Sequence, residues 1–154
     1  MGPNIKKVGI RDVEFAANVT IVEPVNIYGC KIGENAFIGP FVEIQKDVVI
    51  GKDCKIQSHT FICELVTIGN QCFIAHGVMF INDLFESGGP AMGDKTKWKS
   101  TKIGNKVSIG SNATILPVEI CDDVVIGAGA VVTKNITQSG VYAGNPAKLI
   151  KKLK

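Results

Sequence analysis

Apolar residues recur at every sixth position over much of this chain. From residue 32 to residue 80 the recurring residue is isoleucine with one exception: Ile32, Ile38, Ile44, Ile50, Ile56, Ile62, Ile68, Ile74 and Phe80. Four residues after each of the first eight stands a small or β-branched residue: Ala36, Val42, Val48, Cys54, Thr60, Val66, Cys72 and Val78. An α-helix needs apolar residues three and four positions apart, and a coiled coil needs a period of seven. The pattern instead indicates short strands joined by turns and stacked as parallel coils.

The same register extends towards both ends of the chain. It can be read before residue 32 and again after residue 102, with a five-residue step from Ile27 to Ile32 and another from Ile115 to Ile120. Between Phe80 and Ile103 the period disappears, and residues 83–101 are rich in Gly, Asp, Lys and Ser. We therefore predict one all-β domain over residues 1–154, built of three-sided coils, from which residues 83–101 protrude as a loop.

The end of the chain predicts a different element. Asn145 suits the N-cap of a helix and Pro146 its first turn. Leu149, Ile150 and Leu153 are spaced as a small apolar stripe that would cover the last coil. We expect a short C-terminal helix over residues 145–154.

Composition narrows the class of protein. Hydrophobic residues make up 45% of the chain and charged residues 20%, which excludes a disordered chain. A net charge of +3 gives no reason to expect a nucleic acid or a membrane as partner. Five cysteines, an odd number at irregular spacing, fit a reducing compartment, so we expect a cytoplasmic protein. Cys54 and Cys72 lie eighteen residues apart, one three-sided turn, and are predicted to be small core residues.

Four segments carry a resemblance to a known family. They are IAHGVMFIND (74–83), VSIGSNATILP (107–117), VIGAGAVVTKNI (125–136) and VYAGNPAKLI (141–150). Together with the six-residue repeat, they resemble the hexapeptide-repeat acyltransferases, and among these the nucleotide-sugar 3-N-acetyltransferases. The resemblance implies a left-handed parallel β-helix, a homotrimer, and acetyl-CoA as the acyl donor. It also implies that the acceptor is the 3-amino group of a UDP- or dTDP-linked amino sugar used in surface polysaccharide such as lipopolysaccharide.

The acceptor side of the reaction needs groups that orient a sugar and handle a proton. His59 and His76 are the only imidazoles of the chain, and we expect them near each other on one edge of the coil. His76 is a candidate general base, with a substrate-binding or structural role as the alternative. Asn82 and Asp83 are candidates for orienting the sugar and its amine, and a turn at the start of the loop is their structural alternative. His59 is a weaker candidate for substrate binding.

The donor side rests on small residues and on lysines. The resemblance implies that pantetheine lies along the coils between subunits, where small residues are needed: Ser111, Ala113, Ala128, Gly129 and Ala130. The main-chain N–H of Ser111 or of a neighbour could bind the oxyanion. Lys134 and Lys148, with Lys151 as a further option, could meet the phosphates of CoA, next to Asn145 and Pro146 of the AGNPAK segment.

Three other functions compete with this interpretation. A sugar or xenobiotic O-acetyltransferase would need His76 as a true base, since a hydroxyl is a much weaker acid than an ammonium group. A zinc-dependent γ-type carbonic anhydrase would need three histidines, whereas this chain has two, so no metal site is expected. A structural β-solenoid without enzyme activity would not bind acyl-CoA.

Overall fold

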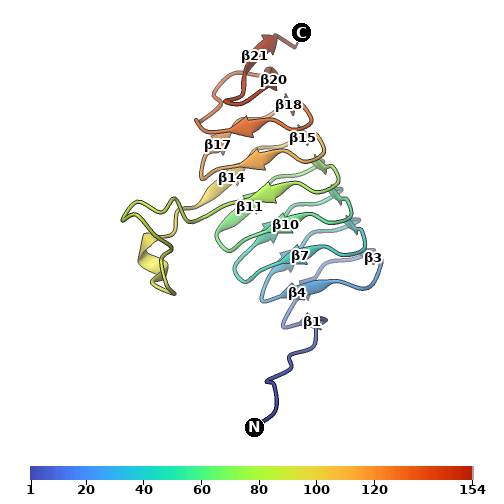
Figure 1. Cartoon of the computed structure of the whole chain (residues 1–154). Coiled ribbons are helices and arrows are strands. Elements are labelled where there is room, and N and C mark those ends of the chain that lie inside the picture. Colours follow the sequence, from blue (N-terminus) through green and yellow to red (C-terminus); the bar gives the residue numbers. More distant parts are fainter. Residues whose placement is uncertain (154) are drawn as a thin grey trace.

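The computed structural model describes residues 1–153 as a three-sided β-solenoid of about seven turns (Figure 1). Its walls are three sheets, named here the first, second and third face in the order in which the chain visits them. The first face has seven strands: β1 (Ile10–Arg11), β4 (Asn26–Tyr28), β7 (Glu43–Ile44), β10 (Phe61–Ile62), β13 (Met79–Phe80), β16 (Thr114–Ile115) and β19 (Val131–Val132).

The other two walls follow the same order of coils. The second face has six strands: β2 (Glu14–Phe15), β5 (Lys31–Ile32), β8 (Val49–Ile50), β11 (Val66–Ile68), β14 (Thr101–Ile103) and β17 (Glu119–Ile120). The third face has eight: β3 (Thr20–Ile21), β6 (Phe37–Ile38), β9 (Lys55–Ile56), β12 (Phe73–Ile74), β15 (Ser108–Ile109), β18 (Val124–Ile126), β20 (Gly140–Ala143) and β21 (Lys148–Lys151). All neighbours pair in parallel except β20 and β21. The predicted arrangement of a left-handed parallel β-helix is confirmed.

The interior is formed by the repeating isoleucines. On the first face Ile27 pairs in register with Ile44, and Ile44 with Ile62, so identical side chains stack along the axis. The eight small positions predicted to face inward, from Ala36 to Val78, are all buried. Burial of one such isoleucine side chain contributes roughly 1.5–3 kcal/mol. Each coil therefore covers the apolar face of the next, as the six-residue period requires.

Buried cysteines occupy some of these inward positions, as predicted for Cys54 and Cys72. The Cys54 thiol donates a hydrogen bond to the Gly69 carbonyl of the next coil at 3.1 Å, and the Cys72 thiol donates to Gly104 O at 3.1 Å. Burial raises the pKa of Cys30 to about 11 and that of Cys63 to about 12. These two thiols therefore stay protonated at neutral pH and behave as core groups.

The three corners of the solenoid differ in chemistry and are named here by their contents. The loop corner joins the first face to the second and contains residues 45–47, 63–65, 81–100, 116–118 and 133–135. The Asn/Asp corner joins the second face to the third and contains residues 33–35, 51–53, 69–71, 104–106 and 121–123. The histidine corner joins the third face to the first and contains residues 39–41, 57–59, 75–77, 110–112 and 127–129.

The predicted loop leaves the solenoid where the period fails. The Ile81 N–H still donates to Ile115 O at 3.0 Å, and the chain rejoins the second face at β14. In between, the chain extends away from the body and contains one 3₁₀ turn, η1 (Lys95–Lys97), capped by the Asp94 side chain (Figure 1). Both five-residue steps of the sequence fall at the loop corner, where Cys30 and Val118 remain buried.

The C-terminal helix predicted over residues 145–154 is wrong. Residues 148–151 form β21, which pairs antiparallel with β20, and the chain reverses through the cis Asn145–Pro146 bond. An isolated helix of this length is marginal in water, whereas β20 offers an open edge of main-chain donors and acceptors. Strand β21 pairs with this edge and satisfies its main-chain donors and acceptors. Ile150 is exposed as a result, so the expected apolar stripe does not cover the last coil.

We expect glycine at the Asn/Asp corner to be required because adjacent coils approach closely there. A Cβ at Gly69 would lie 2.5 Å from the Gly104 oxygen and 2.8 Å from Asn105 Oδ1, whereas a Cβ at Gly89 in the loop would meet nothing within 4 Å. Gly69→Ala is predicted to lower the free energy of unfolding by about 1–3 kcal/mol. Thermal unfolding monitored by circular dichroism, with Gly89→Ala as the matched control, measures the difference. Equal midpoints for the two variants would contradict this account.

Candidate functional site

Both histidines lie at the histidine corner, on adjacent coils, as their spacing predicts. The exposed His76 ring faces Ser58 of the coil below, with 2.9 Å between Nδ1 and the serine Oγ. When Nδ1 carries the proton and donates it to Ser58, the lone pair of Nε2 is free to accept another. The His59 ring packs against Phe41, with ring centroids 5.0 Å apart. Ser58 thus orients His76 by a hydrogen bond, while His59 is held by an aromatic contact.

Three of the small residues predicted for the donor, Ser111, Ala128 and Gly129, continue this corner above His76. The Asn112 N–H donates to His76 O at 2.9 Å, and the Gly129 N–H donates to Ser111 O at 2.8 Å. His76, Ser111 and Ala128 therefore occupy equivalent turn positions in three successive coils, which are about 4.8 Å apart. The structure brings these three predicted residues together on one edge.

The main-chain donors of this edge are free. Within residues 1–153, the N–H groups of Ser58, His76, Ser111 and Ala128 donate no hydrogen bond to another protein group. An unpaired N–H at a surface is satisfied by water or by a ligand. The histidine corner thus offers a row of backbone donors, one per coil, that a ligand with regularly placed acceptors could bind.

At the Asn/Asp corner, side chains accept hydrogen bonds from three of the equivalent N–H groups, those of Lys52, Asn70 and Asn105. Asn70 N donates to Asn105 Oδ1 at 2.8 Å, and Asn105 N donates to Asp122 Oδ1 at 2.7 Å. These hydrogen bonds from Asn105 hold the pKa of Asp122 below its usual range. The contrast between the corners is a property of the sequence, since Asn and Asp stand at one corner where Ser, His and Ala stand at the other.

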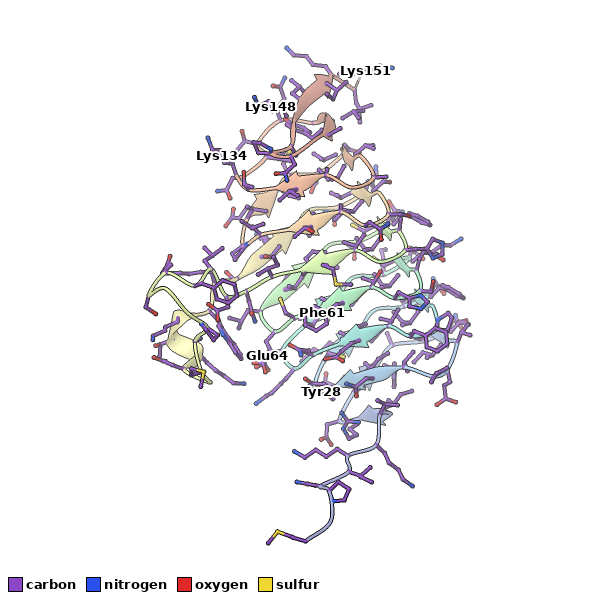
Figure 2. All side chains as sticks on the ribbon, viewed as in Figure 1. Tyr28, Phe61, Glu64, Lys134, Lys148 and Lys151 are labelled. Atoms are coloured by element: carbon purple, nitrogen blue, oxygen red, sulfur yellow. The ribbon has the colours of Figure 1, made fainter. Side chains whose placement is uncertain are left out.

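Other residues predicted for the donor lie elsewhere. The side chains of Ala113 and Ala130 are fully buried in the interior, so only their main chain could reach a ligand. Lys134 lies at the loop corner, and Lys148 begins β21 at the C-terminal end (Figure 2). Asn145 and Pro146 belong to the reversal between β20 and β21. The flanking groups bond to the first face: Val131 N donates to Gly144 O at 3.0 Å, and Ala147 N donates to Val131 O at 2.8 Å.

Asn82 and Asp83 begin the loop. The Asn82 Nδ2 donates to Glu64 O at 3.3 Å. Both carboxylate oxygens of Asp83 accept main-chain hydrogen bonds from the loop, from Phe85 N at 3.0 Å and Ala91 N at 2.7 Å. Asp83 therefore organises the loop, which is the structural alternative considered for it. Asn82 keeps its Oδ1 without a partner among residues 1–153.

Within a single chain, the residues of the histidine corner do not lie close to Asn82 and Asp83 of the loop corner. His76 lies at the histidine corner and Asn82 at the loop corner, at the two ends of the same strand of the first face. At roughly 3.3 Å per strand residue, the full width of that face separates them. A reaction centre that used both would have to combine two copies of the chain.

A chain of polar residues at the loop corner could not be found from the sequence. The Glu64 side chain, 12% exposed, binds Lys95 of the loop through both carboxylate oxygens, at 2.7 and 2.9 Å. Its main-chain N–H donates to Gln45 Oε1 at 3.3 Å, and Gln45 donates to Glu43 at 3.0 Å. Figure 2 shows Glu64 on the same side of the solenoid as Tyr28, whose pKa is raised by burial and by these carboxylates. The sequence offers no signal because Lys95 and Glu64 are 31 residues apart.

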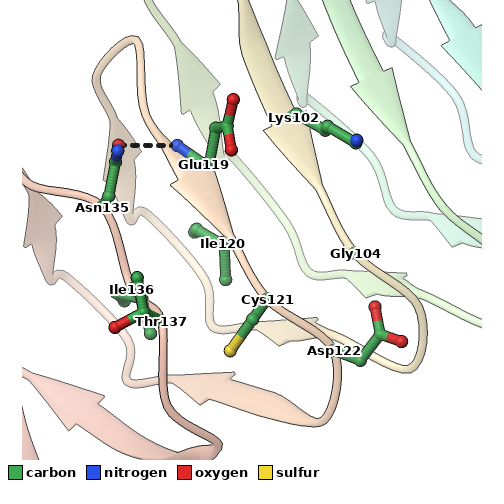
Figure 3. Close-up of a pocket in the computed structure, with 9 residues that line it drawn as sticks. All are labelled: Lys102, Gly104, Glu119, Ile120, Cys121, Asp122, Asn135, Ile136 and Thr137. Carbon is green, nitrogen blue, oxygen red and sulfur yellow. Dashed lines mark hydrogen bonds between the residues drawn. The ribbon is translucent and has the colours of Figure 1, made fainter.

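A further hollow lies outside both clusters. It is a polar notch of about 550 Å³ on the second face, above β17, where the next coil is reduced to a single bridge between Ile120 and Ile136 (Figure 3). Asn135 closes one side by accepting a hydrogen bond from the Glu119 N–H at 2.9 Å. No residue predicted for donor or acceptor lines it.

Comparisons with known proteins agree with this geometry. The family profile described as "Bacterial transferase hexapeptide (six repeats)" matches residues 29–64, and "Hexapeptide repeat of succinyl-transferase" matches residues 100–134. A curated relative, the bifunctional protein GlmU of Bdellovibrio bacteriovorus, is 34% identical over 122 residues, which is 79% of this chain and 24% of that protein. The chain spans less than a third of the length of the first curated relatives that it matches.

Solved structures share the fold. The D94A mutant of AntD, an N-acyltransferase from Bacillus cereus in complex with dTDP and coenzyme A, superposes with a TM-score of 0.73 at 23% identity, over 94% of this chain and 83% of that chain. A hexapeptide-repeat acetyltransferase of Vibrio cholerae complexed with acetyl-CoA gives a TM-score of 0.66 at 22% identity, over 82% and 72% of the two chains. Two stretches of the chain therefore match models of hexapeptide repeats, and the chain has the fold of these two acyltransferase structures.

The described residues contain neither a membrane-spanning helix nor a cluster of metal ligands. Over residues 1–153 there is no helix with the length and apolar character to cross a bilayer. The same part of the chain has no group of three or more His, Cys, Asp or Glu side chains placed to hold a metal ion.

The contact between Glu64 and Lys95 is predicted to hold the loop against the body. The hydrogen bond to Glu64 raises the pKa of Lys95, so its ammonium group keeps its charge until the pH rises above the lysine's ordinary range. Glu64→Gln should speed proteolytic cleavage within residues 83–100 by roughly two- to fivefold, a modest effect because Lys95 is exposed. Glu14→Gln, which breaks the surface pair with Lys31, is the matched control. Equal cleavage rates in the two variants would refute the assignment.

Proposed function

We propose that this protein is an acetyl-CoA-dependent acetyltransferase whose acceptor is the amino group, at C3, of a UDP- or dTDP-linked amino sugar destined for surface polysaccharide. The observation that carries the donor assignment is the row of free N–H groups at the histidine corner. Pantetheine contains two amides, and their carbonyls could accept hydrogen bonds from donors spaced one coil apart. The bound ligands of AntD, dTDP and coenzyme A, support the pairing of a nucleotide with an acyl carrier on this fold.

The chemistry assigned to the site is direct acyl transfer. The lone pair of the acceptor amine attacks the thioester carbonyl and forms a C–N bond while the C=O becomes an oxyanion, which a free N–H such as that of Ser111 could stabilise. Collapse breaks the C–S bond, and CoA leaves as the thiolate. The nitrogen loses one proton, which His76 Nε2 can accept and pass to the sulfur. Ser58 keeps the imidazole oriented through Nδ1.

Turnover is predicted to depend on both substrates. CoA released from acetyl-CoA, measured with a thiol reagent, should appear with UDP- or dTDP-linked amino sugars and be absent with the corresponding hydroxyl sugars. His76→Ala should lower kcat by about tenfold or less for an amine that arrives uncharged, whereas loss of an obligatory base costs about 10²–10⁴-fold. Lys6→Ala, in the exposed N-terminal segment, is the control. Release with hydroxyl sugars alone, abolished in His76→Ala, would instead establish the O-acetyltransferase alternative.

We further propose a cytoplasmic homotrimer with each active site between two subunits. The separation of His76 from Asn82 within one subunit supports this arrangement, because a neighbour's loop corner could supply what the histidine corner lacks. In a triangular prism, packing the second face of one copy against the third face of the next leaves these two corners side by side at the outer rim of the interface.

Mixed trimers test whether sites are shared. Ala128→Trp should block the donor edge and Asn82→Ala should weaken the acceptor side, so each homotrimer is predicted to be nearly inactive. Co-expression in equal amounts leaves about one site in four intact, since half of the histidine corners and half of the loop corners are unaltered. Thiol release by the purified mixture should recover to about a quarter of the unsubstituted protein's rate, and sedimentation equilibrium should give three times the chain mass. No recovery in the mixture would mean that one subunit holds the whole site.

A further inference from the structure

A cavity of about 420 Å³ lies where the loop joins the first face, and neither the donor nor the proton chemistry uses it. It is lined mainly by apolar side chains of β10, β13 and the two limbs of the loop: Phe61, Cys63, Met79, Phe80, Ile81, Phe85 and Trp98, with the polar residues Gln45, Asn82 and Asp83. Apolar walls with a few polar groups at one side are typical of small-molecule sites. Figure 2 places Phe61 on the first face, beside the base of the loop.

Four aromatic residues line this cavity, and loop contacts hold two of them. Phe85 has a left-handed backbone with φ of 53°, which is uncommon for a bulky residue. Its N–H donates to Asp83 Oδ1, and its carbonyl accepts from Gly88 N at 2.8 Å, so the loop maintains this conformation. The Phe85 side chain is nevertheless 58% exposed. The loop thus places a largely exposed aromatic ring at the wall of the cavity.

Trp98 is fixed from the other limb of the loop. The Lys95 Nζ lies 5.4 Å from the centroid of the indole ring and is itself bound by both oxygens of Glu64. The ammonium group is therefore held in place and cannot leave the ring freely. Glu64 thus connects the body of the solenoid to one wall of the cavity.

The polar side of the cavity has unused hydrogen-bonding capacity. Asn82 donates one N–H to Glu64 O, and its Oδ1 accepts nothing from residues 1–153. Gln45 donates one N–H to Glu43, which leaves its second amide hydrogen free. The cavity therefore presents one free acceptor and free amide donors next to aromatic walls.

We infer that this cavity binds the pyrimidine ring of a uracil or thymine nucleotide. The inference rests on the proposed function, which supplies the nucleotide-linked class of acceptor, and adds where its base is recognised. Both bases carry a ring N–H between two carbonyl oxygens, which matches an acceptor at Asn82 flanked by amide donors. A base stacks favourably on aromatic side chains such as Phe85 and Trp98. Cytosine has a ring nitrogen that accepts where uracil donates, so it fits the free Asn82 oxygen less well.

The other cavities suit such a ring less well. The notch on the second face has no aromatic side chain among its lining residues. The hollow at the N-terminal end has a single aromatic ring, Phe15, which is 45% exposed, and a single amide side chain, Asn18. Among these three, only the cavity at the loop combines several aromatic rings with two amide side chains.

Trp98 is the single tryptophan of the chain, so its fluorescence reports directly on this cavity. UDP or dTDP without a sugar is predicted to quench the emission of the whole protein saturably, with CDP binding more weakly. Phe85→Ala should raise the midpoint of the titration by roughly tenfold through loss of stacking. The matched control is Met92→Ala, which removes a large exposed side chain from the same loop, also at a left-handed backbone position but outside the cavity, and should leave the midpoint unchanged.

The outcomes separate this inference from the proposed function. Saturable quenching that depends on Phe85, with no CoA release in the transfer assay, would support the base site and refute the acetyl transfer. CoA release without quenching by either nucleotide would refute the base site and leave the transfer intact. Equal midpoints for UDP and CDP, or an unchanged midpoint in Phe85→Ala, would also overturn the inference.

Discussion

Parallel hydrogen bonding between successive coils is the interaction on which the rest of this molecule depends. It fixes the register so that Ile27 lies under Ile44 and Ile44 under Ile62, and every buried position is therefore repeated along the axis. Because each coil contacts only its neighbours, a residue that disturbs one coil, such as a side chain in place of Gly69, acts on the coil above as well. The same register also aligns the turns, and aligned turns make each corner a continuous surface.

The corners differ in which main-chain groups their turns leave unsatisfied. At the Asn/Asp corner, Asn105 and Asp122 accept the main-chain hydrogens of their neighbours. At the histidine corner, Ser111 and Ala128 have no such partner, so the same backbone offers its donors outward. The difference needs no change of fold, only a change of side chain at one turn position. Which corners of this solenoid present free N–H groups thus depends on which turns lack a side chain that accepts a hydrogen bond from the main chain.

The six-residue period of the sequence predicted the features that it determines, whereas features that do not depend on the period could not be predicted. The inward Ile and Cys positions, the five-residue steps, the loop and the proximity of His59 to His76 all follow from counting residues along a coil. The pairing of Glu64 with Lys95 does not, because a loop has no period and its return path is set by contacts between residues distant in sequence. The C-terminal helix failed for a related reason: the open edge of β20, a tertiary feature, overrode the local signal of Asn145 and Pro146.

Under the acetyl transfer proposed above, the loop corner and the histidine corner meet two requirements that conflict on a single edge. A thioester arm needs small side chains and bare backbone, as at Ala128, whereas a base or sugar needs bulky rings and directed amides, as at Trp98 and Asn82. One turn of a six-residue repeat has too few positions to meet both needs. Placing them at opposite ends of the first face meets each separately, but then the reacting atoms can approach only if a second copy presents its other corner. On this account, assembly is a requirement of the chemistry, because the coil that builds each half-site also keeps the two halves apart.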